Sequence, residues 1–319
     1  LLRMTLYRVV GNGTRLEYRV LIDKSSGKGT QIPSTNEQPK PKASSVTATG
    51  YINPYQRIQL PEIDPQLNPS YNFNSLIEGG SNKLARTAGI SIANEPGKTI
   101  FNPLFVYGQS GVGKTHLANA IGVMTKQLHP EKRVLYVSAN TFQIQYTDAV
   151  RANSVNDFLN FYQTIDVLIL DDIQEFSGKT GTQNTFFHLF NHLHQSGKQL
   201  ILTSDRSPLV LVGLEARLLT RFKWGLSAEL HQPDYETRIS ILKNILFRDG
   251  VEIPDEIVEY VAKNIKSNVR ELEGAIISLI AQSSFNKREV NLELAKQVVE
   301  KFVKNVKREI SIDYIQKIV

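Results

Sequence analysis

The sequence predicts an α/β fold, in which a parallel sheet covered by helices is followed by an all-helical segment. An apolar strand at 104–107 leads into a glycine-rich loop and then a helical pattern, which is typical of the strand–loop–helix units of parallel sheets. Further apolar runs at 134–137, 166–170 and 200–203 alternate with helical patterns. From Asp234 onward the pattern is helical, with no strand signal.

The composition is that of an ordinary globular chain long enough for two domains. The 319 residues are 41% hydrophobic and 21% charged, and no apolar run approaches the roughly 18 residues of a membrane helix. The chain has no cysteine, which excludes disulfides and thiol chemistry and suits a cytoplasmic location. Residues 1–65 carry nine Lys/Arg against five Asp/Glu, or +4, and the remainder 28 against 26, or +2. The charge of the main body is therefore weak evidence for nucleic-acid binding.

The first 66 residues divide into a patterned stretch and a low-complexity stretch. Residues 1–24 combine helical spacing with strand alternation, which predicts the end of a small α/β module, and they lack the regions of a signal peptide. Because this stretch starts inside a pattern and without Met, we expect the chain to be a fragment. Residues 25–66 are rich in Gly, Ser, Thr, Pro and Lys, the composition of a flexible linker.

An aromatic-rich segment precedes the first sheet strand. Tyr71, Phe73, Leu76 and Ile77 restart the apolar pattern, and residues 82–92 then predict a helix. Two interpretations of the aromatic segment remain open. It packs in the core, or it lines an adenine pocket beside the loop that follows the first strand.

The loop after the first strand matches the phosphate-binding P-loop pattern. Gly108, Gly111 and Gly113 let the backbone curl so that its N–H groups converge on phosphate oxygens, and the following helix N-terminus favours their negative charge. Lys114 should reach the β- and γ-phosphates, and the Thr115 hydroxyl should ligate Mg²⁺. The sequence therefore predicts a nucleotide site here.

Acidic residues follow two later strands. Asp171 and Asp172 end the run at 166–170, which is the Walker B arrangement downstream of a P-loop, although a strand ending in a polar turn looks the same in isolation. We expect Asp171 to hold Mg²⁺ opposite Thr115, and Asp172 to orient or deprotonate the attacking water. Asp205 follows the next strand and is expected to lie between the P-loop and these acids, in reach of the water or the γ-phosphate.

Two arginines are spaced four residues apart on a predicted helix at 215–222. Arg217 and Arg221 share one helix face, which usually indicates surface salt bridges. An arginine near the end of a P-loop domain also serves as a finger that reaches the nucleotide of a neighbouring subunit.

The helical segment predicts helices at 234–248, 255–264, 268–284 and 291–308. Asn268 is expected to cap the third of these, with Glu271 as its capping-box partner. Arg270 lies in the first turn, where the helix dipole disfavours a cation, and this makes it a candidate functional group.

With these residues assembled, residues 67–319 resemble the DnaA family of bacterial chromosomal replication initiators, which are AAA+ ATPases. The resemblance implies a five-stranded parallel sheet of order 5-1-4-3-2 at 67–230, an all-helical lid at 231–303, and a connector helix at 304–319 leading to a helix-turn-helix domain absent from the chain. Residues 1–24 resemble the end of the family's helicase-contacting module. The motifs that carry the resemblance lie at 68–73, 101–104, 108–116, 171–174, 203–206, 221–226 and 267–274.

The resemblance also implies roles for single residues. Asp205 matches sensor I, and Arg270 matches sensor II, a γ-phosphate contact from the lid. Arg221 matches the finger that reaches the next subunit's ATP, and Arg217 a nearby interface arginine. Implied ligands and partners are ATP or ADP with Mg²⁺, origin DNA, further copies of the chain, the replicative helicase and acidic phospholipids, at a cytoplasmic, nucleoid-associated location.

The sequence departs from the family pattern at two places. The family's single-strand DNA contacts use an aliphatic residue and a Lys/Arg pair; Lys179 fits, but Gln143 and Gly181 occupy the other positions. Asp172 stands where faster AAA+ motors carry Glu, and its shorter arm predicts slow hydrolysis. The resemblance, together with the short arm of Asp172, implies a weak ATPase in which ATP drives assembly on origin DNA and strand opening, and hydrolysis resets the assembly.

Three alternatives share the ATPase core. A replicative helicase loader would lack the connector at 304–319. A protein-remodelling motor needs an aromatic–aliphatic–glycine loop after the second strand, which residues 138–146 do not contain. A nucleotide sensor that does not hydrolyse ATP remains open.

Overall fold

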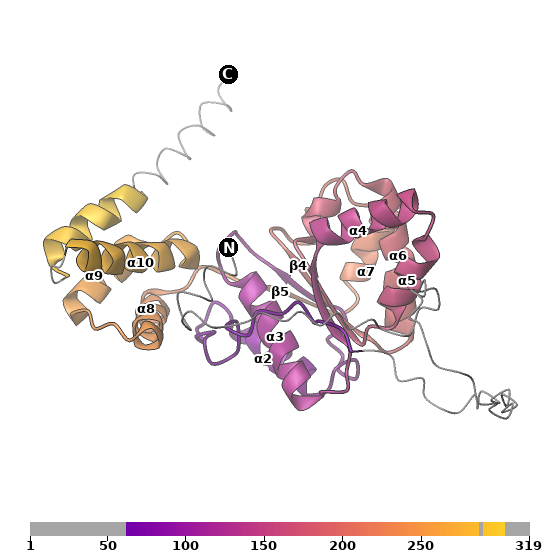
Figure 1. The fold of residues 1–319 in the computed structure, drawn as a ribbon, viewed down its shortest axis with the longest axis horizontal. Helices are drawn as coiled ribbons and strands as arrows, with labels where there is room; N and C mark the ends of the chain where they lie inside the picture. Colours follow the sequence, from indigo (N-terminus) through magenta and orange to yellow (C-terminus); the bar gives the residue numbers. More distant parts are fainter. Residues whose placement is uncertain (1–61, 287–289, 304–319) are drawn as a thin grey trace, which may run out of the picture. The chain divides into compact units, whose positions relative to one another are not determined.

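The computed structural model describes residues 62–286 and 290–303. The predicted module at 1–24, nearly all of the linker and the connector at 304–319 lie outside the described residues. The described part is a parallel sheet with helices on both faces, followed by helices alone (Figure 1). We call the sheet with its helices the base (residues 67–230) and the helices after it the lid (residues 231–303).

The sheet has five parallel strands in the order β2-β3-β4-β1-β5. This is the predicted order 5-1-4-3-2 counted from the other edge, so the prediction of fold class is confirmed. Because all strands run the same way, their carboxyl ends meet at one edge, where the P-loop and the acidic residues follow. The strands are Leu104–Tyr107 (β1), Val134–Ser138 (β2), Val167–Asp171 (β3), Gln199–Ser204 (β4) and Leu226–Glu229 (β5).

Both faces of the sheet are buried, which explains why the first four strands are continuous apolar runs. Phe105, Leu168 and Leu202 pack against the helices of one face, whereas Val106 and Ile169 pack against those of the other. The first face is covered by α4 (Ala139–Arg151), α5 (Val155–Gln163), α6 (Thr180–Gln195) and α7 (Ala216–Phe222), and the second by α2 (Lys83–Asn94) and α3 (Lys114–Leu128) (Figure 1).

The helical pattern between the second and third strands is two helices rather than one. α4 ends at Arg151 and α5 begins at Val155. Between them, Asn153 has a φ of 54°, a left-handed conformation that a continuous helix does not contain. A short 3₁₀ helix, η1 (Ile173–Phe176), follows Asp172 and was not predicted.

The lid has its own apolar core. Its helices are α8 (Tyr235–Asp249), α9 (Asp255–Asn264), α10 (Val269–Asn286) and a last helix over 292–303. Leu242, Val261 and Ile276 are buried together at its centre. Among the described helices, none is long and apolar enough to cross a membrane.

The predicted cap at the start of α10 is confirmed. The Glu271 amide donates to Asn268 Oδ1 at 2.9 Å, and Asn268 Nδ2 donates back to Glu271 Oε1 at 3.1 Å. This closed pair fixes the first turn of α10, which carries Arg270.

Gly225 marks the place where the chain entering β5 approaches the chain entering β1. A Cβ at Gly225 would lie 2.1 Å from the Pro103 carbonyl oxygen, which also accepts from the Leu226 amide at 3.0 Å. Because the Pro103 oxygen belongs to the backbone, it cannot move away as a flexible side chain could. We expect Gly225→Ala to lower the free energy of unfolding by about 1–3 kcal/mol in chemical denaturation. Gly80→Ala, which meets nothing within 4 Å, is the control; an equal loss in both variants would contradict the steric argument.

Candidate nucleotide-binding site

A cavity of about 370 Å³ lies where the loop after β1 meets the first turn of α10. Most of the residues predicted from separate motifs come together in its wall. Two further predicted residues contact lining residues without lining the cavity themselves. The Gly108 carbonyl oxygen accepts from Lys114, and the Asp171 carboxylate accepts from Thr115. The lining residues are Tyr71, Ser110, Gly111, Gly113, Lys114, Thr115, His116, Asp172, Gln174, Asp205, Val269, Arg270 and Glu273.

The P-loop backbone depends on its glycines, as Gly111 and Gly113 show. Gly111 and Gly113 have φ values of 78° and 101°, in the left-handed region. A Cβ at Gly111 would also lie 2.8 Å from Asn268 Oδ1, so the loop and the lid approach each other closely there. Because α3 begins at Lys114, its unpaired N-terminal N–H groups and its dipole lie at this loop and favour an anion.

Lys114 is 8% exposed and lies against the loop that precedes it. Its Nζ donates to the carbonyl oxygens of Gly108 at 2.8 Å and Gln109 at 2.9 Å. Burial lowers the pKa of Lys114, and the carboxylates of Asp172, Asp171 and Asp205 oppose this shift. Lys114 is therefore a buried cation among three acidic side chains.

Asp171 is 3% exposed and is held by three hydroxyl groups. Its Oδ2 accepts from Thr115 Oγ1 at 2.8 Å and from the Tyr136 hydroxyl at 2.7 Å, and its Oδ1 accepts from the Thr203 hydroxyl. Burial and the charge of Asp171 raise the pKa of Tyr136, so the phenol keeps the proton that it donates. Tyr136 and Thr203 were not among the predicted site residues.

Asp172 and Asp205 are connected through Gln174. Asp172 has a φ of 60°; its amide donates to Thr203 Oγ1 at 2.9 Å, and its Oδ1 accepts from Gln174 Nε2 at 2.9 Å. Gln174 Oε1 in turn accepts from the Asp205 amide at 3.2 Å. Asp205 Oδ1 is buried and has no hydrogen-bond partner among the described residues. A buried acceptor without a partner indicates that a ligand or a water supplies one.

The lid contacts the P-loop directly. Arg270 Nη1 donates to Ser110 Oγ at 3.0 Å, and the Val269 amide donates to the Gly111 carbonyl oxygen at 3.0 Å. Glu273, one turn further along α10, also lines the cavity, and burial raises the pKa of its carboxyl group. Arg270 thus lies at the P-loop end of the cavity, although it belongs to the first turn of a lid helix.

The aromatic segment before β1 both packs in the core and lines a cavity. Tyr71 stacks on the His116 ring with centroids 4.8 Å apart, and both rings line the main cavity and a smaller neighbouring one of about 60 Å³. Leu76 and Ile77 line the smaller cavity, whereas Phe73 packs in the core of the base. Core packing therefore holds for Phe73, whereas Tyr71, Leu76 and Ile77 line a cavity whose binding of adenine stays a prediction. His116 was not predicted as a site residue.

The remaining predicted residues lie outside the cavity wall. Arg217 and Arg221 are on α7, where Arg217 pairs with Glu215 at 2.5 Å and Arg221 Nε donates to Asn191 Oδ1 at 2.8 Å.

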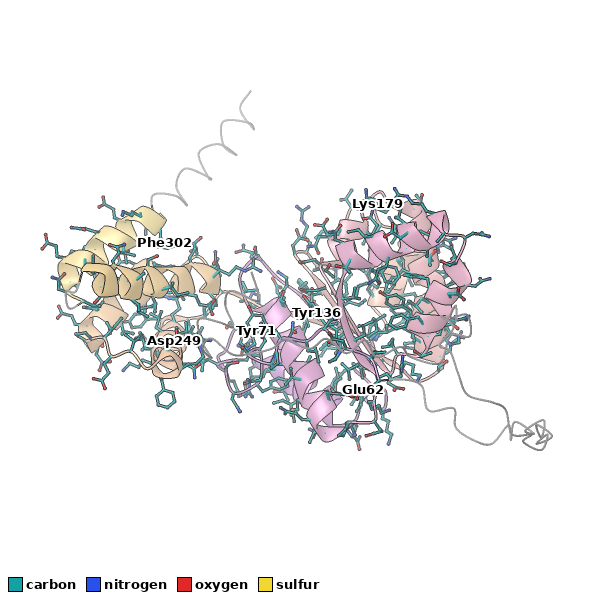
Figure 2. All side chains as sticks on the ribbon, viewed as in Figure 1. Glu62, Tyr71, Tyr136, Lys179, Asp249 and Phe302 are labelled. Carbon is teal, nitrogen blue, oxygen red and sulfur yellow. The ribbon has the colours of Figure 1, made fainter. Side chains whose placement is uncertain are left out.

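Lys179 precedes α6 and is exposed. Figure 2 shows it on the α4–α6 side of the base, away from Tyr71. Gly181 is also exposed, and a Cβ there would lie 3.4 Å from the Tyr146 hydroxyl on α4. Gln143 lies on the same helix as Tyr146. The structure brings none of these three into the cavity wall.

The donor set at the end of β3 fits Mg²⁺. The Thr115 hydroxyl and the Asp171 carboxylate are hard oxygen donors 2.8 Å apart. In the described ranges, no cluster of three or more His, Cys, Asp or Glu side chains forms a metal site. One carboxylate and one hydroxyl suit an ion that completes its shell with phosphate oxygens and water.

The sheet order, the P-loop after β1, the acids after β3 and the lid that touches the loop define a P-loop ATPase of the AAA+ class. A solved Holliday junction branch migration motor, RuvB of Thermotoga maritima, shares the fold with a TM-score of 0.55 at 17% identity. The chain belongs to the bacterial DnaA family, since the sequence model of the bacterial DnaA ATPase domain matches residues 67–229.

Relatives and solved structures agree with this assignment. The chromosomal replication initiator protein DnaA of Flavobacterium psychrophilum is 59% identical over 332 residues, which cover 100% of this chain and 69% of the relative. That of Bacteroides fragilis is 54% identical over 325 residues, covering 100% and 68%.

Domain III of the replication initiation protein DnaA of Thermotoga maritima has a TM-score of 0.72 at 40% identity, covering 75% of this chain and 99% of that one. A replication initiator DnaA bound to AMPPCP and single-stranded DNA has a TM-score of 0.63 at 40% identity, covering 67% and 66%. These matches favour the initiator over the helicase-loader alternative.

Proposed function

We propose that the chain is the ATP-controlled part of a chromosomal replication initiator, which binds ATP between base and lid and assembles on origin DNA. The observation that supports this most directly is the contact of Arg270 and Val269 with Ser110 and Gly111. A triphosphate in the P-loop would touch both base and lid. The nucleotide would therefore determine how the lid is held against the base. ATP would favour an arrangement of base and lid to which ADP binds less well.

Each residue of the cavity has a role in this proposal. Gly108, Gly111 and Gly113 shape the loop whose N–H groups hold the phosphates, and Lys114 contacts the β- and γ-phosphates. Thr115 and Asp171 would hold Mg²⁺, which neutralises phosphate charge when bound.

The remaining polar groups act at the γ-phosphate. Asp172 orients or deprotonates the attacking water, and Asp205 offers its unpartnered Oδ1 to that water. Arg270 contacts the γ-phosphate from the lid. Because the Asp172 arm is short, hydrolysis is slow and resets the assembly rather than driving a motor.

Assembly is proposed to depend on Arg221, which reaches the ATP of a neighbouring copy, with Arg217 beside it at the interface. Arg221→Ala is expected to leave the Kd for ATP within about twofold of the wild-type value, because Arg221 does not line its own cavity. ATP-dependent oligomers in light scattering should disappear, since the γ-phosphate loses its partner across the interface. Lys223→Ala, which removes an exposed charge just after α7, is the control. Retained oligomers in Arg221→Ala would overturn the finger assignment.

Further partners are proposed on the family assignment. A solved relative binds single-stranded DNA, and in this chain Lys179 is the matching cation on the exposed start of α6. A helix-turn-helix domain would bind duplex origin DNA, the module ending at residue 24 would contact the replicative helicase, and the basic stretch at 301–308 acidic phospholipids. The site of action is the nucleoid.

A further inference from the structure

Arg221 is held at the surface of the base by two aromatic rings and an amide. Its guanidinium carbon lies 3.8 Å from the centroid of the Trp224 ring and 5.6 Å from that of Phe187. Its Nε donates to Asn191 Oδ1 at 2.8 Å. Stacking on a ring face together with a single lateral hydrogen bond fixes the direction in which the planar guanidinium points.

The two arginines of α7 are held differently. Arg217 is neutralised by Glu215 at 2.5 Å, donates to Asn184 Oδ1 at 3.0 Å and lies over Phe187. Arg221 has only uncharged partners, and the described residues supply no carboxylate for it. Its two Nη nitrogens and its full charge therefore remain available for a phosphate, which a guanidinium binds with two parallel hydrogen bonds.

The Trp224 ring is itself braced from the base. The Trp224 amide donates to the Arg221 carbonyl oxygen at 3.1 Å, and the ring lies 5.1 Å from that of His194 on α6. His194 stacks on Phe190, and its Nε2 lies 3.2 Å from the Asn102 carbonyl oxygen beside β1. The support under Arg221 is thus tied to both α6 and the chain entering β1.

We propose that Trp224 is a positioning residue that orients the Arg221 guanidinium for the γ-phosphate of the ATP held by a second copy of this chain. The inference rests on the proposed function, because it gives Arg221 the trans-acting role. An unrestrained arginine side chain loses conformational entropy when it binds a phosphate. Because stacking on Trp224 already restricts Arg221 before the copies meet, less entropy is lost on assembly. Since only the contact with the γ-phosphate benefits, and ADP has no γ-phosphate, Trp224 acts on assembly with ATP and not on assembly with ADP.

The test compares Trp224→Leu, Trp224→Phe and Arg221→Ala in the full chain. Light scattering gives the midpoint protein concentration for assembly with ATP and with ADP, and a separate titration gives the Kd for ATP. Trp224→Leu is expected to raise the ATP midpoint about two- to fivefold, the size of an exposed cation–π contact, and to leave the ADP midpoint and the Kd unchanged. Trp224→Phe keeps a ring face and should stay within about twofold of wild type.

Controls separate this inference from the proposed function and from misfolding. Phe247→Leu removes another exposed aromatic, 88% exposed on α8, and should change neither midpoint. If Trp224→Leu raises the assembly midpoint equally with ATP and with ADP, the ring itself contacts the partner copy. If it leaves the ATP midpoint unchanged, the ring has no role in assembly. Either result overturns the inference. Nucleotide-dependent assembly retained by Arg221→Ala would instead overturn the proposed finger.

A second measurement needs no assembly. Trp224 is the only tryptophan in the chain and is 49% exposed, so fluorescence of the unassembled protein, excited at a wavelength that the 12 tyrosines do not absorb, reports on its ring alone. Arg221→Ala should change the intensity or wavelength of this emission, and Lys223→Ala should not. Emission that is the same in Arg221→Ala and in wild type would show that the guanidinium does not rest on the ring, and would overturn the inference.

Discussion

Replacing Lys114 with alanine is expected to weaken ATP binding by at least about 100-fold, measured as the Kd in a calorimetric titration. Lys114 is the only lysine in the wall of the described cavity, and it is almost wholly buried there. Each hydrogen bond from an ammonium group to a phosphate contributes roughly 1.5–3 kcal/mol, and two such bonds correspond to a loss of this size. The Gly108 and Gln109 carbonyl oxygens would also lose the donor that they share.

The matched control for Lys114→Ala is Lys126→Ala on the same helix. Lys126 lies near the C-terminal end of α3, where it pairs with Glu62 at 3.4 Å and donates to the Pro130 carbonyl oxygen. Its removal takes the same charge from α3 and should leave the Kd for ATP nearly unchanged. A Kd within about threefold of wild type in Lys114→Ala would show that this loop is not the phosphate site.

The first four strands were predictable from sequence because they are buried on both faces and therefore appear as apolar runs. β5 was not found from its residues, and only the family resemblance implied it. Of its four residues, Leu226 to Glu229, only Ala228 is buried, so that β5, unlike β2 at the opposite edge of the sheet, is mostly uncovered. A short, half-exposed edge strand leaves little periodic signal.

The break between α4 and α5 had a weaker sequence signal. Both segments have helical spacing, so periodicity alone joins them. Asn153 and Ser154 indicate the interruption, because asparagine tolerates a left-handed backbone and serine favours the position before a helix.

Predicted site residues are those that belong to local motifs, and two of the missed ones, Tyr136 and Thr203, contact the site from other strands. Tyr136 and Thr203 reach Asp171 across the sheet, because β2 and β4 both pair with β3. Finding them requires the strand order and the register, which no single motif contains. A hydroxyl group inside an otherwise apolar buried strand is the signal that was available, since such a group needs a partner.

The Tyr71–His116 stack had even less signal. The two rings come from segments about 45 residues apart, on either side of β1. Aromatic residues before a buried strand usually belong to the core, as Phe73 does here. Only the tertiary structure shows that Phe73 packs in the core whereas Tyr71 lines the cavity.

Asp172→Asn is expected to slow ATP hydrolysis by about 100- to 10,000-fold while ATP binding and ATP-dependent assembly persist. An amide cannot take the proton of the attacking water, so the loss falls on the chemical step. The substitution should not disturb the fold, because Asp172 has a φ of 60° and asparagine adopts this conformation as readily. Its side-chain oxygen can still accept from Gln174 Nε2.

Single-turnover hydrolysis with bound ATP measures this effect without interference from product release. Asp148→Asn, an exposed acid paired with Arg151 on α4, is the control and should hydrolyse at the wild-type rate. An unchanged rate in Asp172→Asn would move the role of base to another acid of the cavity, and Asp205 with its unpartnered oxygen is the next to test. If the wild-type chain itself binds ATP without hydrolysing it, Asp172 has no chemical step to serve. The nucleotide would then be released by exchange, and the protein would be a sensor rather than a switch reset by hydrolysis.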